Sequence, residues 1–214
     1  MKRKFLFDQN KCVGCGTCVL ACKNEYQTPP DINYRTVRPA DENPDVPERQ
    51  FVNTACVHCD KPACAPSCPV SAYSKRADGV VVQNQDACIG CKKCIAACPY
   101  GAPQYYAPAN KVRKCELCYQ RLDANQIPSC VKGCPVGALG MLDLDSGKVV
   151  TSLGTLAKVE GTVDNLPELP DKSITTPNHR FILRKPAKQT RYPVIAPMMD
   201  DQKKGPEEKA GFKG

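Results

Sequence analysis

Sixteen cysteines dominate the chemistry available to this 214-residue chain, and their spacing divides them into four groups of four. The first and third groups read C-x2-C-x2-C-x3-C, the second reads C-x2-C-x4-C-x3-C, and the fourth has eleven residues between its two pairs. Thiolates at such spacings can wrap a [4Fe-4S] cluster, so the sequence predicts four clusters with about 16 iron atoms. The groups are Cys12, Cys15, Cys18 and Cys22; Cys56, Cys59, Cys64 and Cys68; Cys88, Cys91, Cys94 and Cys98; and Cys115, Cys118, Cys130 and Cys134.

Disulfides and zinc are the other common uses of cysteine, and neither fits the repeated spacing well. Disulfide scaffolds belong to short secreted chains, and bridges between cysteines only two residues apart would close very small rings. Zinc ribbons use C-x2-C pairs separated by a longer loop, a pattern that only the fourth group has. The first and third groups have the spacing of bacterial ferredoxins, in which the last cysteine turns toward a second cluster. A zinc-binding module stays a remote alternative.

Short helices and one hairpin are predicted to position the cysteines. The second, third and fourth groups each end in Cys-Pro, followed by Val-Ser-Ala, Tyr-Gly-Ala and Val-Gly-Ala, so they are copies of one module. Residues 72–74 and 80–82 flank an Asp-Gly turn, which favours a tight hairpin. Residues 18–22 and 94–98 have the apolar, alanine-bearing composition of a short helix. Four helical residues rise about 6 Å, so the two cysteines at the ends of such a helix can reach neighbouring clusters.

Residues 56–106 therefore read as a complete two-cluster ferredoxin unit, which leaves the first and fourth groups to pair with each other. In this nested arrangement, each group gives three cysteines to one cluster and its last cysteine to the neighbouring cluster. Pairing the first group with the second, and the third with the fourth, is the alternative, which the long insert between the first two groups makes less natural. The nested sets are the Cys12 set (Cys12, Cys15, Cys18, Cys134), the Cys56 set (Cys56, Cys59, Cys64, Cys98), the Cys88 set (Cys88, Cys91, Cys94, Cys68) and the Cys115 set (Cys115, Cys118, Cys130, Cys22).

The predicted fold is α+β, with two ferredoxin-like (bacterial 2[4Fe-4S]) modules in a pseudo-twofold arrangement, an insert and an extended C-terminal tail. Residues 1–22 and 107–140 are expected to form the outer module, which holds the first and fourth cysteine groups. Residues 56–106 are expected to form the inner module, which holds the second and third groups.

Two segments without cysteines are expected to serve other purposes. Residues 23–55 contain five prolines and read as a surface insert that can touch a partner. Residues 141–214 read as a Pro-rich extension and partner-binding tail, in which residues 141–176 can add a strand or short helix. The apolar side chains after residue 177, including Phe181, Ile182 and Leu183, have few visible means of burial in this chain, so we expect them to wrap a partner.

The formal net charge of +8 counts every thiol as neutral. Each oxidised cluster with four thiolates carries about −2, so four clusters bring the loaded protein close to neutrality. The basic excess is therefore interpreted as compensation for the clusters, and nucleic acid is not an expected partner. Six basic residues adjoin the cysteine groups, and each by itself reads as an exposed surface residue: Lys11, Lys23, Lys92, Lys93, Arg113 and Lys114.

Membrane spanning is not predicted, because no stretch approaches the ~18 apolar residues that a membrane helix needs. The basic, apolar start of the chain fails as a signal peptide at Asp8 and reads instead as a first strand. The expected location is the cytoplasm, or a membrane-associated or periplasmic place reached through partner subunits.

Nothing in the chain beyond the cysteines indicates bond-making chemistry, so no catalytic residue is predicted. His58 lies inside the second group, where it can tune a cluster by a hydrogen bond to sulfur or pack beside it. His179 is given no role. Tyr100, Tyr105 and Tyr106 follow the third group and are expected to shield a cluster from water.

The motifs resemble a known family. The second group, the phrase Cys-Pro-Tyr-Gly-Ala-Pro-Gln-Tyr after Ala97 and the eleven-residue gap in the fourth group are similar to the four-cluster iron–sulfur subunit of the dimethyl sulfoxide reductase family. The resemblance covers residues 4–140 and is loose in the tail. It implies the nested cysteine sets, a large molybdenum or tungsten bis-pterin catalytic subunit as partner, and often a membrane subunit that handles quinone. In some relatives one ligand is replaced and a [3Fe-4S] cluster results, a departure that is absent here.

The predicted function is therefore electron transfer through four [4Fe-4S] clusters, between that catalytic subunit and a redox partner, without catalysis by this chain itself. The alternative is a free polyferredoxin, or a carrier linked to a hydrogenase or formate dehydrogenase. Potentials of this cluster class span about 1 V, so the direction of electron flow does not follow from the motifs.

Overall fold

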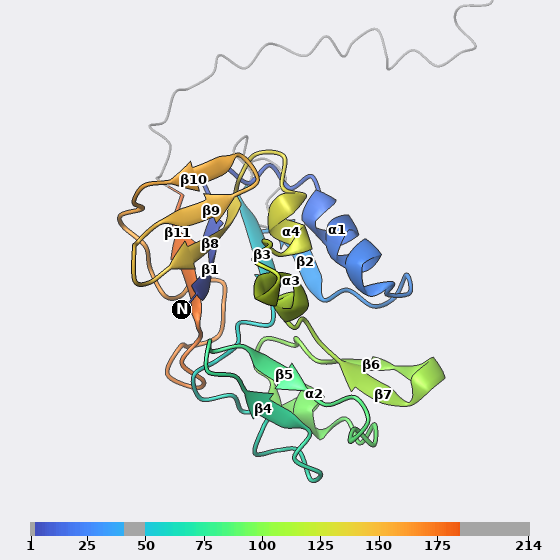
Figure 1. Cartoon of the computed structure of the whole chain (residues 1–214). Coiled ribbons are helices and arrows are strands. Elements are labelled where there is room, and N and C mark those ends of the chain that lie inside the picture. Colours follow the sequence, from blue (N-terminus) through green and yellow to red (C-terminus); the bar gives the residue numbers. More distant parts are fainter. Residues whose placement is uncertain (1–2, 41–49, 185–214) are drawn as a thin grey trace, which may run out of the picture. The chain divides into compact units, whose positions relative to one another are not determined.

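The largest element of the computed structural model is a five-stranded sheet with strand order β10-β9-β8-β1-β11. The structure describes residues 3–40 and 50–184, and the chain up to Arg184 clusters into one compact unit. β1 lies inside the sheet, antiparallel to β8 and parallel to β11 (Figure 1). The strands are β1 (Arg3–Asp8), β8 (Leu139–Asp143), β9 (Val149–Thr151), β10 (Gly154–Leu156) and β11 (His179–Ile182).

β1 confirms the first strand predicted from the start of the chain, and it is buried on both faces. Phe5 and Phe7 point to one face and join the main apolar core, while Leu6 points to the other and packs in a smaller core with Leu142. All three side chains are at most 3% exposed. β1 is therefore packed against apolar side chains on both faces of the sheet.

The expectation that Phe181 and Ile182 lack a place for burial within this chain is wrong. β11 pairs with β1 from Phe5 opposite His179 to Asp8 opposite Ile182, and Phe181 is 1% exposed in the main core. This pairing joins residues more than 170 positions apart, which no local pattern reveals. Leu183, the next residue, is 39% exposed. The rest of the predicted partner-binding tail, residues 185–214, lies outside the described residues.

The first and fourth cysteine groups meet through their helices. α1 (Thr17–Tyr26) contacts α4 (Ser129–Lys132), and the two run close together, since a Cβ on Gly133 would lie 2.9 Å from that of Ala21. α3 (Tyr119–Asp123) lies between the two cysteine pairs of the fourth group. The pairing of β1 with β8 joins the same two parts of the sequence. Both contacts bring the ends of the cysteine-bearing region together.

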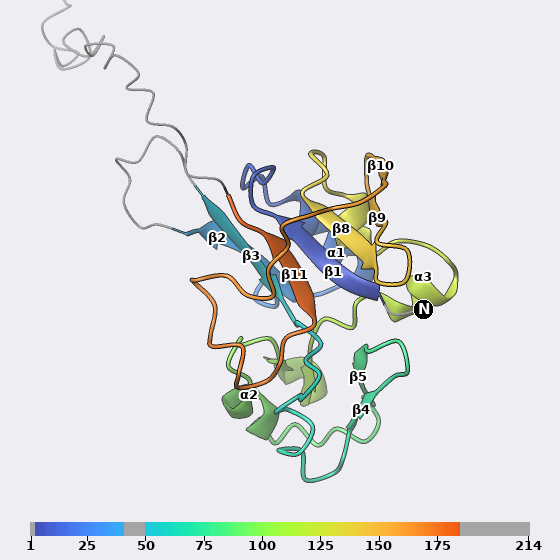
Figure 2. The same cartoon turned by 90° about the vertical axis from the view of Figure 1, so that its left-hand side faces the viewer.

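The predicted surface insert is instead partly a core element. β2 (Arg35–Pro39) and β3 (Phe51–Ala55) form an antiparallel hairpin beside the sheet (Figure 2). Ile32, Tyr34 and Arg35 are each at most 5% exposed, and so is Asn53. The apolar residues scattered among the prolines are therefore used to cover cysteines, not to face solvent.

The middle of the chain follows the sequence prediction closely. The Asp-Gly turn connects β4 (Tyr73–Lys75) to β5 (Val81–Gln83), an antiparallel hairpin one residue away from the expected bounds. The short helix expected in the third group is α2 (Lys93–Ala97), and the one in the first group lies within α1. β6 (Gln104–Tyr106), the 3-10 turn η1 (Ala107–Ala109) and β7 (Lys111–Arg113) complete this part. In Figure 1 these elements occupy the lower half of the ribbon.

The first and third groups both contain the sequence Cys-x-Gly-Cys, and in both the glycine lies in close contact with another part of the chain. A Cβ at Gly14 would lie 2.2 Å from the ring of Phe51, and one at Gly90 would lie 2.4 Å from the backbone oxygen of Asn110. Both glycines have left-handed φ values, 71° and 69°. The two cysteine loops are thus packed in the same way against different neighbours.

Replacing Gly90 by alanine is expected to destabilise the fold more than the same change at Gly101. Their φ values of 69° and 61° are alike, and a left-handed backbone costs alanine about 1–2 kcal/mol. Gly101 has open space around its missing Cβ, whereas Gly90 faces the Asn110 backbone. We expect a further loss of roughly 1–3 kcal/mol at Gly90, measured by anaerobic denaturant unfolding of the iron-loaded variants. Equal losses at the two positions would contradict this account.

Helices in the described part of the chain are all short, and α1 is the longest with 10 residues. Within residues 3–40 and 50–184, none has the length and apolar character needed to cross a bilayer.

Candidate iron–sulfur sites

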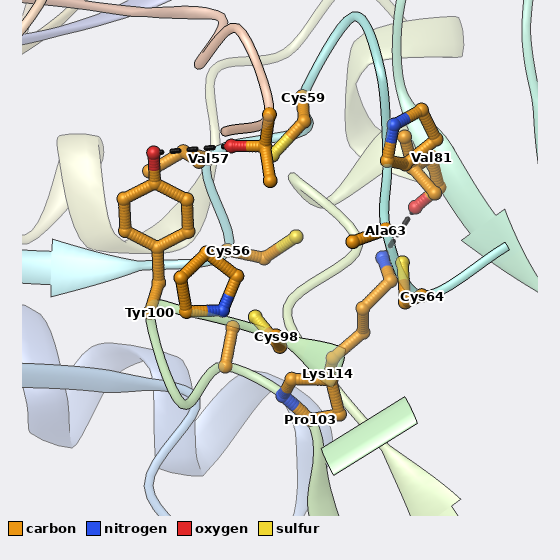
Figure 3. A pocket seen from close by; sticks show the side chains of 14 residues that line it. Cys56, Val57, Cys59, Ala63, Cys64, Val81, Cys98, Tyr100, Pro103 and Lys114 are labelled. Atoms are coloured by element: carbon orange, nitrogen blue, oxygen red, sulfur yellow. Dashed lines mark hydrogen bonds between the residues drawn. The ribbon is translucent and has the colours of Figure 1, made fainter. Parts of the chain in front are cut away.

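A pocket beside β5 and the end of α2 brings together four cysteines from two different groups. Cys56, Cys59 and Cys64 of the second group line it with Cys98 of the third. Figure 3 shows their sulfurs turned toward the same space, which measures about 370 Å3 including its opening to solvent. This combination matches the predicted Cys56 set.

Cysteines of the first and fourth groups also approach one another. The pKa of the Cys12 thiol is raised by burial, and its neighbours Cys18 and Cys134 add to the rise. Burial raises the pKa of Cys22 to about 12, with Cys130 and then Cys118 contributing. Cys18 is near Cys130 as well as Cys134, so the cysteines of the predicted Cys12 and Cys115 sets lie close to one another.

The remaining cysteines lie around the β4–β5 hairpin. Cys88 and Cys94 are buried in one apolar group, and Cys68 packs against it. The pKa of Cys94 is raised mainly by burial, and Cys88 and Cys91 contribute to the rise. Cys64 packs against the same group, so the Cys56 and Cys88 sets are close neighbours. The structure thus brings together cysteines that belong to different motifs.

The Cys-Pro phrase has a structural purpose that the sequence alone did not reveal. Four residues after each of these cysteines, an alanine backbone N–H donates a hydrogen bond to the cysteine sulfur, at 3.3 Å in the second and fourth groups. The residue before each alanine has a left-handed φ, between 49° and 61°. The donor and acceptor pairs are Ala72 to Cys68, Ala102 to Cys98 and Ala138 to Cys134. Such N–H···S bonds are one of the means by which proteins adjust cluster potential.

Two buried cations lie among the cysteines, although both were expected at the surface or given no role. Lys114 is 2% exposed, and its Nζ donates to the carbonyl oxygens of Val81 and of Cys115. It also lines the pocket of the Cys56 set, where Figure 3 shows it reaching past Cys64. Arg35 is likewise 2% exposed. The prediction of a solvated side chain is therefore wrong for Lys114, whereas Lys92 and Lys93 are exposed as predicted.

The histidines lie in buried surroundings. The backbone N–H of Val81 donates to Nδ1 of His58 at 3.1 Å, so that atom supports the hairpin and not a sulfur. His179 stacks near Phe5, with ring centroids 5.0 Å apart, and burial with the nearby Arg35 charge lowers its pKa to about 3. His179 was given no role from sequence, yet it is a neutral buried residue between Phe5 and Phe181.

Tyrosines flank the cysteine sets. Tyr100 lines the pocket of the Cys56 set and accepts a hydrogen bond from the Thr175 hydroxyl at 3.1 Å. Tyr106 packs against the buried group that contains Cys56 and Cys115, and Tyr105 packs against that of Cys88. These positions agree with the shielding role predicted for all three.

The donor groups present fit an iron–sulfur cluster. Burial raises the pKa of Cys64 to about 12 and that of Cys115 well above its ordinary value, so neither ionises readily without positive charge beside it. Within the described residues, the Nε of Arg35 is buried near cysteines without a hydrogen-bond partner. Buried donors are rarely left unpaired, and the sulfides of a bound cluster are acceptors for them. In the same part of the chain, no three His, Cys, Asp or Glu side chains are close enough to hold one metal ion.

Comparisons with known proteins agree with these sites. Residues 47–144 match the family of 4Fe-4S dicluster domains, and residues 3–24 match a 4Fe-4S binding domain family. The B chain of anaerobic dimethyl sulfoxide reductase from Haemophilus influenzae is 37% identical over 197 residues, which cover 87% of this chain and 90% of the relative. The corresponding protein from Escherichia coli is 36% identical over 81% of this chain and 85% of the relative. The B subunit of tetrathionate reductase from Salmonella typhimurium is 38% identical over 62% of this chain and 54% of the relative.

The two types of observation converge on one identity. The cysteine loops supply thiolates in the spacing of [4Fe-4S] clusters, and the similarity to the first two relatives extends over more than four-fifths of the chain. The chain therefore belongs to the family of iron–sulfur electron-transfer subunits that includes the B chain of anaerobic dimethyl sulfoxide reductase.

Proposed function

We propose that this subunit holds four [4Fe-4S] clusters in the nested Cys12, Cys115, Cys56 and Cys88 sets and passes electrons along them in that order. The observation that carries the proposal is the pocket in which Cys98 joins three cysteines of the preceding group. The proximity of Cys22 to Cys130 and Cys118 supports the equivalent exchange between the first and fourth groups.

The module division is part of the proposal. Residues 1–22 and 107–140 would form the outer module, a view supported by the contacts of β1 with β8 and of α1 with α4. Residues 56–106 would form the inner module. The matching approaches at Gly14 and Gly90 support a pseudo-twofold relation between the two. Residues 23–55 and 141–214 would then be additions to this pair, with partner contacts in the tail beyond β11.

Electrons would enter and leave where a cysteine reaches the surface. Cys15 and Cys91 are the exposed members of the sixteen, and they belong to the two sets at the ends of the proposed order. Each has an exposed aliphatic neighbour, Val13 at 60% and Ile89 at 55%. Apolar side chains around an exposed cluster loop are suited to docking against a partner that excludes water from the transfer path.

The proposed partners are a large molybdenum or tungsten bis-pterin catalytic subunit and, in addition, a membrane subunit that handles quinone. The support is the relatives, which are named as single chains or subunits of dimethyl sulfoxide and tetrathionate reductases. The subunit itself would be non-catalytic. Its access to a membrane would come through the second partner.

Native anaerobic purification of the tagged chain is expected to recover a large subunit with molybdenum or tungsten, and about 16 iron atoms per copy of this chain. Metal analysis and mass spectrometry of the purified complex provide the measurement. A chain that carries its iron but purifies alone would favour the alternative, a free polyferredoxin or a carrier linked to a hydrogenase or formate dehydrogenase. Zinc in place of iron would contradict both functions.

A further inference from the structure

Arg35 is the largest side chain that the described part of the fold buries almost completely. It begins β2, opposite Ala55 of β3, in the segment expected to be a surface insert. Its guanidinium lies over the ring of Phe5, 4.3 Å from the centroid. A charge placed this deep is costly unless an opposite charge compensates it.

The compensating groups are cysteines. Within residues 3–40 and 50–184, none of the ion pairs involves Arg35. Its strand partner Ala55 lies in one buried group with Cys22 and Cys115. The hydrogen-bond partner of Arg35, Asn53, donates to Cys18. Burial lowers the pKa of Arg35, and four nearby thiols raise it: Cys130, Cys115, Cys18 and Cys22. Three of them belong to the Cys115 set, and Cys18 belongs to the Cys12 set.

A hydrogen-bond relay connects Arg35 to the second of these sets. Its Nη1 donates to Oδ1 of Asn53, and Nδ2 of Asn53 donates to Sγ of Cys18 at 3.3 Å. Because the Asn53 side-chain oxygen accepts from Arg35, the side-chain amide nitrogen of Asn53 faces the sulfur of Cys18. The Nε of Arg35 stays buried without a partner among the described residues, on a side chain surrounded by thiols.

We propose that Arg35 is a positioning residue for electron transfer, which raises the reduction potential of the Cys115 set and, through Asn53, that of the Cys12 set. The inference rests on the proposed ligand sets. A [4Fe-4S] cluster held by these cysteines would supply one-electron chemistry. An added electron would make the site more negative by one charge, and Arg35 would stabilise that charge.

The chemistry of arginine suits this purpose. A guanidinium keeps its proton at every physiological pH, so its field on the cysteine sets is constant. Arg35 is 2% exposed, and charges interact more strongly in such buried surroundings than at the surface. The Asn53 amide adds a hydrogen bond to sulfur, which also favours the reduced form. Together the two groups would raise the reduction potentials of the Cys115 set and the Cys12 set.

The test is an anaerobic redox titration of the full chain in its native assembly, followed by electron paramagnetic resonance. The signal of the Cys115 set is identified as the one altered by Cys118→Ser. Arg35→Gln is expected to make reduction of that set at least tenfold less favourable, a shift of about 59 mV for one electron. Arg35→Lys, which keeps the charge, is expected to recover most of the shift.

Two control variants distinguish charge at this position from general disturbance. Arg121→Gln removes a half-buried cation of α3 that already pairs with Glu25 at 3.3 Å, so we expect less than a twofold change, roughly, for a screened pair. Lys114→Gln removes the buried cation beside the Cys56 set and is expected to shift that set instead. An Arg35→Gln shift spread equally over all signals would overturn the proposal.

The experiment gives different results if the proposed function is wrong and if only the inference about Arg35 is wrong. If Cys118→Ser alters no single signal, the proposed ligand sets are wrong. If Arg35→Gln keeps its iron and its potentials are unchanged, Arg35 has no such role although the function stands. If Arg35→Gln does not assemble, Asn53→Asp decides, because its carboxylate would pair with Arg35 and cancel the charge. Unchanged potentials in Asn53→Asp would overturn the proposal.

Discussion

A chain with Cys98→Ser is expected to lose or alter the cluster of the Cys56 set while the cluster of the Cys88 set stays intact. Cys98 follows Cys94 by only four residues, so its position in the sequence would assign it to the Cys88 set. The structure separates the two, because α2 ends at Ala97 and the backbone of Cys98 is extended, with φ −86° and ψ 113°. Its side chain therefore lies in the pocket with Cys56, Cys59 and Cys64.

The size of the effect follows from the loss of one thiolate ligand in four. A hydroxyl is a poor replacement at iron, so the altered site would lose its corner iron or the whole cluster, which leaves about 12 to 15 iron atoms of the expected total. Iron analysis gives the amount, and electron paramagnetic resonance identifies which signal changes. Loss of one iron would produce the signal of a [3Fe-4S] centre.

Cys68→Ser is the matched control, since Cys68 closes the second group as Cys98 closes the third. Its sulfur packs against the buried group of Cys88 and Cys94. We expect it to alter the Cys88 set and spare the Cys56 set, the reverse of Cys98→Ser. If each variant damaged the set of its own motif, the nested arrangement would be refuted.

Local signals explain which parts of the fold were predictable. The β4–β5 hairpin follows from an Asp-Gly turn between apolar residues, and the short helices follow from the residues between two closely spaced cysteines. Each of these depends on fewer than a dozen neighbouring residues. The cysteine groups were also predictable from local sequence, because their spacing alone specifies the loop around a cluster.

Long-range partners explain the rest. Phe181 was wrongly expected to contact a partner because β11 and β1 lie at opposite ends of the described chain, and a parallel pair leaves no turn between its strands. Arg35 was overlooked because a lone arginine among prolines has the sequence pattern of a surface residue. The thiols near it come from the first and fourth groups, and its own segment contains no cysteine before Cys56 that would indicate this. Arg35 and Asn53 lie in the insert that covers the cysteines. Buried clusters need nearby cations and hydrogen-bond donors, so the basic and amide residues of that insert were the signal to look for.

Removal of iron is expected to unfold the part of the chain between Cys56 and Cys115 while the five-stranded sheet survives. Cysteines are three of the seven buried members in the group of Ile32 and Tyr34, and two of the five in the group of Tyr73. The strands there have three residues each and form separate two-stranded sheets, an arrangement that is marginal in water without further support. Structural metal sites contribute of the order of 10 kcal/mol to folding.

The sheet has a different source of stability, since Phe5, Phe7 and Phe181 pack with Leu139 and Met141 in a core that is mainly aliphatic and aromatic. Hydrogen exchange of the full chain after chelation should therefore show loss of protection in β4 to β7 and retention in β1 and β8. Reconstitution with iron and sulfide should restore protection in β4 to β7, because the protection is lost through removal of the clusters and the polypeptide itself is unchanged. Protection of β4 to β7 in the iron-free chain would show that its protein contacts suffice without the clusters.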